Sequence, residues 1–417
     1  METLNVFLCA QLTGELCFNN GDLSFTYDTN YLNTNEAKKL SSALPLQAQI
    51  FKHQECHAFF SGLLPDEEIR RTLARYLQIS ETNIFGLLKA IGGECAGAVS
   101  LHRAKRNQKE GNNNSYKTLS NKEAQRLLLT LDTRPLLVGD KGVRMSAGGA
   151  QNKLMVSFIQ GKLALPLYDS PSTHILKPAM KDFPDSVFNE FFCMKLAQEL
   201  GLNTANAAII WIEKQAYYLT ERYDRVLAES GEIIRLHQED FCQAMNIPPE
   251  LKSENEGGPS LVQCKQLIDQ KVAQGRMKGV SKIEFLKIII FNYLIGNGDA
   301  HAKNFSLLYS GDEEALAPFY DLLSTMVYYN PYKSKMAMKL GGTYKFRTVG
   351  LSNFQKLASH LDIKFSLIEK QINYFKKQIL PKAQTLAKAF NQDSKTQSEI
   401  YQKIIEVIEL NLETLSS

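Results

Sequence analysis

Three polar residues in the last third of the chain have the spacing of a phosphoryl-transfer site. Asp299 and Asn304 lie five residues apart in Gly-Asp-Ala-His-Ala-Lys-Asn (298–304), and Asp321 follows in Pro-Phe-Tyr-Asp (318–321). In protein kinases one Asp accepts the proton of the attacking hydroxyl, while an Asn five residues on and a later Asp hold Mg²⁺. The spacing therefore predicts Asp299 as the catalytic base and Asn304 and Asp321 as metal ligands.

The segment before this loop is almost wholly apolar. Residues 285–295 read Phe-Leu-Lys-Ile-Ile-Ile-Phe-Asn-Tyr-Leu-Ile, and we expect a buried element that delivers the polar loop to an interior edge. The pattern Asp-x-x-x-x-Asn also occurs by chance, and Gly-Asn-Gly-Asp (296–299) is ordinary turn chemistry. The motif alone is therefore a hypothesis that needs a nucleotide site elsewhere in the chain.

A glycine-rich turn upstream offers a site for phosphates. Residues 144–153 read Arg-Met-Ser-Ala-Gly-Gly-Ala-Gln-Asn-Lys and lead into an apolar strand predicted over 154–159. Glycines let backbone amides approach a phosphate closely, because no Cβ intervenes. The turn is neither a Walker A loop nor Gly-x-Gly-x-x-Gly. A glycine-rich turn taken by itself is weak evidence for a phosphate site and is more often a plain hairpin.

A lysine and a glutamate follow in the order that a kinase requires. Lys177 ends a short apolar strand in Thr-His-Ile-Leu-Lys (173–177), where kinases place the lysine that pairs with phosphates. Glu190 lies thirteen residues later in a helical run predicted over 187–200, and it either pairs with Lys177 or is a solvated surface residue. A hairpin over 207–220 then leads to residues 221–223, where a hinge between two lobes belongs.

With these motifs in this order, the chain resembles the HipA family of serine/threonine kinase toxins from bacterial toxin–antitoxin modules. The resemblance covers about the last three-quarters of the chain, and the N-terminal part also looks like the extra domain of that family. The matching segments are Gly-Leu-Leu-Pro-Asp (62–66), Phe-Gly-Leu-Leu-Lys-Ala-Ile-Gly (85–92), Gly-Ala (97–98), Ser-Ala-Gly-Gly-Ala-Gln-Asn-Lys (146–153), Thr-His-Ile-Leu-Lys (173–177), Glu-Arg-Tyr-Asp-Arg (221–225), Gln-Glu-Asp (238–240), Gly-Gly-Pro (257–259), Asp-Ala-His-Ala-Lys-Asn (299–304) and Phe-Tyr-Asp (319–321).

The resemblance implies a role for each residue of the site. Asp299 and Lys177 would be catalytic, Asn304 and Asp321 would hold Mg²⁺, and Ser146 would be the residue whose autophosphorylation ejects the loop and inactivates the enzyme. The residues expected to bind ATP are Ser146, Ala147, Gly148, Gly149, Ala150, Gln151, Lys153, Lys177, Glu221, Arg222, Tyr223, His301, Lys303, Asn304 and Asp321.

Some positions have a second explanation or depart from the family pattern. His301 is expected to form a structural hydrogen bond within the loop rather than to bind a metal, because no Cys/His spacing resembles a zinc site. Lys303 is placed to touch the transferred phosphate. The hydroxyl of Ser146 could instead cap a turn. Asn152 stands where the family often has an acidic residue, and Gly148-Gly149 replaces its usual Ala-Gly.

Composition is that of an ordinary globular protein, with 44% hydrophobic and 22% charged residues in 417. The seven cysteines are scattered and odd in number, so we expect a reducing cytoplasm and no disulfides. The N-terminus lacks a basic signal-peptide start, and the apolar run at 285–295 is too short to span a membrane. A net charge of +4 does not by itself argue for nucleic-acid binding.

Changes in composition along the chain predict an α+β protein of four segments. An N-terminal α/β domain is expected over 1–103, with helical runs near 36–43, 66–77 and 83–91, and a polar linker or exposed loop over 104–118. A mixed α/β kinase N-lobe over 119–225 and a mostly helical C-lobe over 226–417 complete the two-lobed fold.

These features predict a cytoplasmic serine/threonine kinase that uses ATP and Mg²⁺ and acts as a toxin. The resemblance implies a co-encoded HipB-like helix-turn-helix antitoxin, contact with DNA only through that antitoxin, and a translation-linked substrate such as an aminoacyl-tRNA synthetase. Two alternatives remain, a small-molecule kinase of the aminoglycoside type and a non-catalytic scaffold or co-repressor. The ordered motifs argue against the first alternative, and the intact Lys177, Asp299, Asn304 and Asp321 argue against the second.

Overall fold

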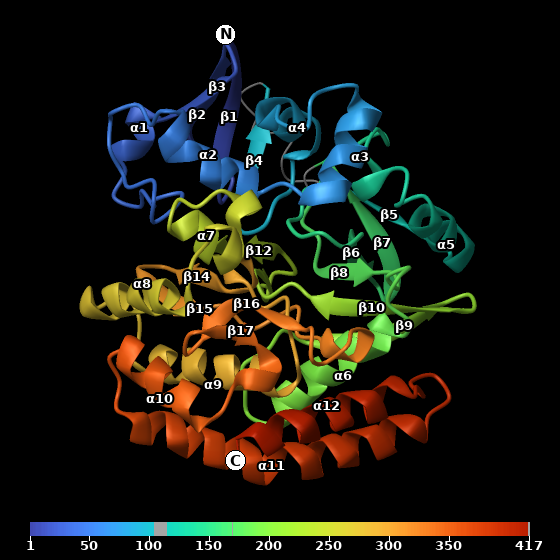
Figure 1. Ribbon diagram of the computed structural model, residues 1–417. Coiled ribbons are helices and arrows are strands. Elements are labelled where there is room, and N and C mark those ends of the chain that lie inside the picture. The colour runs from blue at the N-terminus through green and yellow to red at the C-terminus, as the bar shows by residue number, and fades with distance from the viewer. Residues whose placement is uncertain (104–114, 169, 416–417) are drawn as a thin grey trace.

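The computed structural model describes residues 1–103, 115–168 and 170–415. They form an N-terminal domain, an upper lobe built on a six-stranded sheet, and a mainly helical lower lobe (Figure 1). This is the α+β, two-lobed arrangement with an additional N-terminal domain that the sequence predicts.

The N-terminal domain is an antiparallel sheet of strand order β3-β2-β1-β4, covered by helices. Its elements are β1 (Glu2–Leu8), β2 (Gln11–Asn19), β3 (Asp22–Tyr27), α1 (Thr29–Leu32), α2 (His53–Gly62), α3 (Glu67–Leu77), α4 (Ile84–Ile91) and β4 (Val99–His102). The predicted runs at 66–77 and 83–91 correspond to α3 and α4.

The helix predicted near 36–43 is wrong. Those residues form turns and irregular chain, in which Leu40 is fully buried and polar groups are bound by the lower lobe. Ser41 Oγ donates a hydrogen bond of 2.5 Å to Glu239, and the backbone N–H of Ser42 donates to the same carboxylate at 2.8 Å. Tertiary contacts therefore override the local helical pattern of this segment.

The upper lobe is an antiparallel sheet of order β5-β7-β6-β8-β10-β9. Its elements are β5 (Ser115–Thr118), α5 (Asn121–Leu129), β6 (Leu154–Ile159), β7 (Lys162–Leu167), β8 (His174–Lys177), α6 (Ser186–Glu199), β9 (Ala207–Ile212) and β10 (Gln215–Glu221). The predicted linker at 104–118 therefore needs correction, because residues 115–118 form the edge strand β5 and pair with β7. Residues 104–114 of that linker lie outside the described residues.

The lower lobe contains the long helices and three small sheets. Its elements are β11 (Arg225–Leu227), β12 (Ile233–Arg235), β13 (His237–Asp240), α7 (Phe241–Ala244), α8 (Leu261–Ala273), α9 (Val280–Leu294), β14 (Ser306–Ser310), β15 (Glu313–Leu316), β16 (Lys335–Leu340), β17 (Thr343–Lys345), α10 (Leu351–His360), α11 (Phe365–Asn391) and α12 (Ile400–Thr414). Apolar residues on all sides of α9 are buried, as expected for a helix at the centre of a core.

Two hydrophobic cores divide the molecule differently from the predicted domains. One core joins the N-terminal domain to the upper sheet, since Leu4 and Leu176 belong to the same cluster of buried side chains. The other core joins α6 to the lower helices, as in the stacked rings of Phe192 and Tyr401. Helix α6 therefore belongs by packing to the lower lobe, although it follows the upper sheet in sequence.

Ion pairs also connect the N-terminal domain directly to the lower lobe. Lys39 contacts Glu314 at 2.8 Å, and Arg70 contacts Glu250 at 2.7 Å. In Figure 1 helix α2 of the N-terminal domain lies next to α7 of the lower lobe. Among the described residues, no helix is long and apolar enough to cross a membrane.

Candidate active site

A buried lysine between two carboxylates lies where the lobes meet. Lys177 ends β8, where strand pairing sets it opposite Tyr218 of β10. Its Nζ lies 2.7 Å from Glu190 Oε1 on α6 and also contacts Asp321. The pairing of Lys177 with Glu190 is thus confirmed, and the alternative of a solvated glutamate is excluded because Glu190 is 3% exposed.

The charges of this triad depend on one another. Burial alone would lower the pKa of Lys177, but attraction to Asp321 and Glu190 outweighs it and raises that pKa above its usual value. Burial likewise opposes ionisation of Asp321, yet Lys177 and Lys153 lower its pKa to about 2. Desolvation dominates at Glu190 and raises its pKa to about 7. Asp321 is therefore the firmly ionised carboxylate of the triad.

The glycine-rich turn faces the same cleft. Ser146 is fully buried, and its Oγ donates a hydrogen bond of 2.6 Å to the carbonyl of Leu63 in the N-terminal domain. Gly149 has φ of +97°, a left-handed conformation that favours glycine, and Lys153 Nζ donates to the carbonyl of Gly148. The turn is therefore held closed by contacts with the N-terminal domain and by its own lysine.

The cleft encloses about 990 Å³, including its opening to solvent. Predicted residues that line it are Ser146, Ala147, Gly148, Gly149, Lys153, Lys177, Glu221, Arg222, Tyr223, His301, Lys303, Asn304 and Asp321. Ala150 is exposed and lies outside this lining, as does Gln151, whose amide donates to the carbonyl of Pro178 at 3.1 Å. The structure thus brings together residues from three distant parts of the sequence.

Three lysines lie in the cleft, among several carboxylates. Besides Lys177, Lys153 lines the pocket, where burial lowers its pKa to about 8, and Lys303 contributes a further buried cation. Charges in such a desolvated cleft attract an anion more strongly than they would in water. The arrangement suits the phosphates of a nucleotide.

The predicted catalytic loop begins where α9 ends. Gly296 has φ of +70°, and a Cβ there would lie 2.8 Å from atoms of Met326 and Val407, so only glycine fits this turn. The amide of Asn304 donates a hydrogen bond of 2.8 Å to the backbone carbonyl of Asp299, which closes the loop. Asn304 and Asp321 then line the cleft together.

The carboxylate of Asp299 points to a different space. It lines a second cavity next to the cleft, and 62% of its side chain is exposed. Desolvation by the surrounding protein, together with the nearby Asp321, raises the pKa of Asp299 above its usual value. Water reaching the exposed side chain keeps that rise smaller than full burial would produce.

His301 and Lys303 do not behave as simple nucleotide ligands. Burial lowers the pKa of His301 to about 3, so the ring is neutral, and its Nε2 lies 3.7 Å from Asp299 Oδ1. The hydrogen bond expected within the loop comes from the backbone, because the N–H of His301 donates to the carbonyl of Asp299 at 2.8 Å. Lys303 Nζ contacts Asp66 of the N-terminal domain at 2.5 Å.

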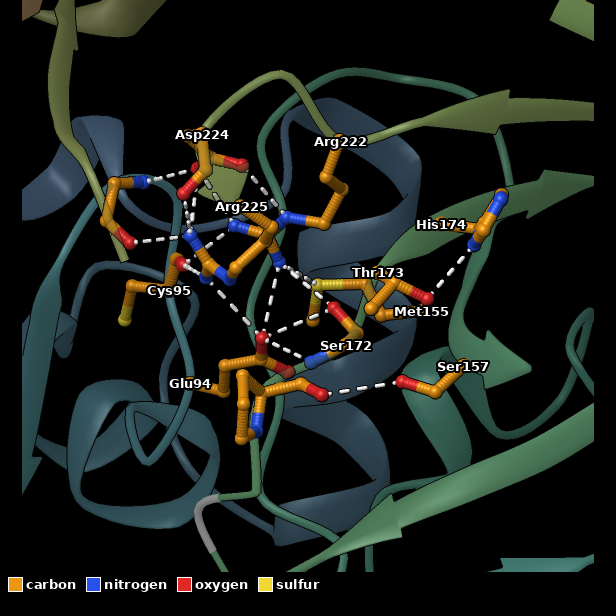
Figure 2. A network of polar contacts seen from close by, with 12 residues as sticks. Glu94, Cys95, Met155, Ser157, Ser172, Thr173, His174, Arg222, Asp224 and Arg225 are labelled. Carbon is orange, nitrogen blue, oxygen red and sulfur yellow. Dashed lines mark hydrogen bonds and ion pairs between the residues drawn. The ribbon is translucent and has the colours of Figure 1, made fainter. Parts of the chain in front are cut away.

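Tyr223 is the aromatic residue of the predicted hinge, and it lines the cleft. Tyr223 stacks on Tyr320 with centroids 5.8 Å apart. The guanidinium of Arg222 is bound instead to Asp224, Glu94 and neighbouring groups (Figure 2). Its backbone N–H donates to the carbonyl of Thr173 at 2.9 Å, so Arg222 has a structural role at the edge of the cleft. Glu221 is exposed and its carboxylate accepts from the amide of Asn206 at 2.8 Å.

Glu94 is a residue whose importance sequence reasoning missed. Figure 2 shows it beneath Arg222 and Arg225, and its Oε1 lies 3.2 Å from each guanidinium. The same oxygen accepts from the backbone N–H and hydroxyl of Ser172, two residues before β8. Its backbone carbonyl accepts from the N–H of Ser146 at 2.7 Å. One N-terminal residue therefore contacts the hinge, the phosphate turn and the approach to Lys177.

Asp66 is a second residue of the N-terminal domain that contacts the site and that the sequence analysis did not predict to do so. It lies in the Gly-Leu-Leu-Pro-Asp segment noted in the sequence, and its backbone N–H donates to the carbonyl of Gly149 at 3.2 Å. Asp240, in contrast, caps a helix, because its carboxylate accepts from the N–H of Gln243 at the start of α7.

The donor set fits a magnesium ion held partly by phosphates. Among the described residues, no cluster of three or more His, Cys, Asp or Glu side chains is arranged to hold a metal by itself. Mg²⁺ usually takes one or two protein oxygens and completes its octahedron with water and phosphate. Asp321 and Asn304, which both line the cleft, would supply those protein oxygens.

The comparisons with known proteins agree with this geometry. Residues 145–394 match the HipA-like C-terminal domain, and residues 4–102 match the HipA N-terminal domain. The Sinorhizobium fredii protein named "Putative kinase Y4mE" is 37% identical over 376 residues, which cover 89% of each chain. The "Serine/threonine-protein kinase toxin HipA" of Shewanella oneidensis is 28% identical over 81% of this chain and 78% of its own.

A solved structure shows the same fold. The HipA chain in a Shewanella oneidensis complex of HipA, HipB and operator DNA superposes with a TM-score of 0.84 at 23% identity, covering 99% of this chain and 97% of that chain. The similarity in fold, the two domain matches and the relative that shares 37% of its residues together show that the chain belongs to the HipA family of toxin kinases.

Proposed function

We propose that this chain is a cytoplasmic, ATP- and Mg²⁺-dependent protein serine/threonine kinase, the toxin of a toxin–antitoxin module. The observation that carries the proposal is the buried triad of Lys177, Glu190 and Asp321 beside a glycine-rich turn and a catalytic loop. Kinase activity requires a lysine paired with a helix glutamate and a metal-binding Asp, and here all three side chains are already in contact.

The residues divide the work of phosphoryl transfer among them. ATP with Mg²⁺ supplies the transferred group and neutralises its charge when bound. Lys177, oriented by Glu190, would pair with the phosphates, and the backbone of residues 146–153 would enclose them. Asp321 would exchange its contact with Lys177 for the metal, and Asp299 would accept the proton of the acceptor hydroxyl.

Inactivation by phosphorylation of Ser146 is part of the proposal. The hydroxyl is fully buried and bonded to Leu63, so a phosphate on it does not fit the closed turn. A phosphoserine carries close to two negative charges and would compete with ATP for the same donors. Modification would therefore require the turn to open and would keep it open.

The partners follow from the relatives. One relative is named a kinase toxin, and a solved neighbour of the same fold is bound to HipB and operator DNA. We propose a HipB-like helix-turn-helix antitoxin for this chain, with DNA contacted only through it. The proposed target is a translation-linked protein such as an aminoacyl-tRNA synthetase, whose phosphorylation would arrest growth.

Phosphate transfer into a host lysate tests this function. Purified protein with radiolabelled ATP and Mg²⁺ should label one or a few lysate proteins, and expression without the antitoxin should stop growth. Asp321→Asn should abolish both effects. Asp362→Asn serves as the matched control, since Asp362 is exposed beyond α10 in a left-handed conformation that Asn also tolerates. Labelling by the Asp321 variant at the wild-type rate would refute the assignment.

A further inference from the structure

A second cavity adjoins the nucleotide cleft, and the catalytic carboxylate forms part of its wall. It encloses about 1100 Å³, including its open mouth. Its lining residues are Met180, Phe183, Gly298, Asp299, Leu323, Thr325, Tyr328, Tyr329, Asn330, Lys333, Ser334 and Lys335. They come from the chain after β8, the catalytic loop, and the segment that leads into β16.

The two cavities separate the residues of the site by role. Lys177, Asn304 and Asp321 line the nucleotide cleft, whereas Asp299 lines the second cavity. A general base must lie within hydrogen-bond reach of the proton that it takes. The second cavity is therefore where the hydroxyl-bearing acceptor reaches Asp299.

The catalytic loop and β16 are tightly joined at this point. The backbone N–H of Gly298 donates a hydrogen bond of 2.8 Å to Thr325 Oγ1. A Cβ at Gly298 would lie 2.6 Å from the carbonyl oxygen of Lys335, so only glycine permits this approach. The close packing keeps the start of β16, including Lys335, beside Asp299.

One wall of the cavity is aromatic. The ring of Phe183 lies 4.9 Å from that of Tyr328 and 6.0 Å from that of Tyr329. Tyr328 is held in place by the amide of Asn189, which donates to its hydroxyl at 3.1 Å, while Tyr329 is 55% exposed. Such a rigid, partly exposed aromatic wall suits an apolar side chain of a binding partner.

The rim of the cavity is basic. Lys333 and Lys335 are both exposed, and neither forms an ion pair with any residue in the described part of the chain. Asp299 is the single carboxylate of the described lining. A polycationic acceptor such as an aminoglycoside requires several carboxylates, so this rim disfavours a small-molecule kinase of that type.

We propose that this cavity binds an extended protein segment in which an aromatic or long aliphatic side chain and an acidic side chain flank the accepting Ser or Thr. The apolar side chain packs on Phe183 and Tyr329, and the acidic one pairs with Lys333 or Lys335. This proposal rests on the proposed kinase function.

The transfer step itself balances within this arrangement. The acceptor Oγ forms a bond to the γ-phosphorus, and the bond from that phosphorus to the bridging oxygen breaks and leaves ADP. The hydroxyl proton moves to Asp299.

The test is a comparison of phosphorylation sites in a dephosphorylated proteome digest. Wild-type protein, the double variant Lys333→Glu/Lys335→Glu, and the control Lys370→Glu/Lys377→Glu are each incubated with the digest, ATP and Mg²⁺. The control residues are exposed on α11, far from the cavity in sequence, and change the net charge equally. Labelled sites are read by mass spectrometry, and ATP binding is measured in parallel.

Wild type and control should label sites enriched in acidic and aromatic neighbours. The cavity double variant should label these sites about tenfold less, because two exposed charge pairs become repulsions, and its sites should shift towards basic neighbours. Equal labelling by all three proteins, or wild-type sites without acidic neighbours, would overturn the proposal. No labelled peptide despite normal ATP binding would overturn it too. Failure to bind ATP at all would instead refute the proposed function.

Discussion

Replacing Glu94 by Gln tests the buried network of Figure 2. Glu94 and Asp224 balance the charges of Arg222 and Arg225, and the four side chains are each at most 3% exposed. The variant removes one negative charge and leaves two guanidinium groups facing a single carboxylate. The NH₂ group of the new Gln side chain would also take the position of Glu94 Oε2. That buried oxygen has no hydrogen-bond partner among the described residues.

The expected cost follows from this loss of balance. Removing one partner of a buried ion pair costs about 3 to 5 kcal/mol, because the remaining charge stays desolvated. Gln retains an oxygen that can accept from Ser172, so we expect the lower end, about 3 kcal/mol. The contact between the Glu94 carbonyl and the N–H of Ser146 involves the backbone and is preserved.

Urea denaturation measures this loss. Trp211 is the one tryptophan of the chain and lies on β9 of the upper sheet. Its fluorescence therefore reports on the lobe that shares a core with the N-terminal domain, which contains Glu94. Glu15→Gln, on an exposed position of β2, is the matched control and should stay within about 0.5 kcal/mol of wild type. An unfolding midpoint for the Glu94 variant equal to that of wild type would refute the reasoning.

The pH dependence gives an independent check. Arg222 and Arg225 outweigh desolvation and lower the folded-state pKa of Glu94 below its usual value. A depressed pKa stabilises the fold above the unfolded value of about 4.3, and that contribution is lost as the pH falls through the folded pKa. The difference in stability between wild type and Glu94→Gln should therefore shrink in acid.

Three further outcomes follow from the site. Asp299→Asn should lower the phosphorylation rate by about 10²- to 10⁴-fold, with ATP affinity unchanged in a binding titration, and a rate like that of wild type would contradict its role as base. ATP with Mg²⁺ should raise the melting temperature, and Asn304→Ala should remove much of the part that depends on Mg²⁺; an undiminished shift would argue against Asn304 as a ligand. ATP binding should weaken as the pH rises through about 8, where Lys153 loses its charge, and the weakening should disappear in Lys153→Met.

Elements with strong local signals were predictable from sequence. The strand predicted over 154–159 has the same residues as β6, and the helix predicted over 187–200 differs from α6 by one residue at each end. Gly201 directly follows the predicted run and has the positive φ that is common just after a helix ends. Such signals lie within a few residues of the element that they specify.

The long-range pairings of charged residues were not predictable. Asp66 and Lys303 are separated by 237 residues, and Glu94 and Arg222 by 128. The sequence around Lys303 and Arg222 does not indicate which of the 44 acidic residues pairs with either of them. These pairs form because the N-terminal domain packs against both lobes. That packing produces no periodic pattern in the sequence from which it could be predicted.

The attachment of the N-terminal domain to both lobes has a consequence for nucleotide exchange. The N-terminal domain shares a core with the upper sheet and forms ion pairs with the lower lobe through Lys39, Arg70 and Asp66. It therefore connects the two lobes on either side of the cleft. Opening the cleft by rotating the lobes would break several of these contacts at once. Displacing the turn at 146–153 would leave these ion pairs intact and break only hydrogen bonds. These are the bonds of Ser146 to Glu94 and Leu63, of Gly149 to Asp66, of Gln151 to Pro178 and of Asn152 to Asp132. For the proposed kinase, movement of this turn is therefore a route by which ATP would enter and ADP would leave while the lobes keep a fixed separation.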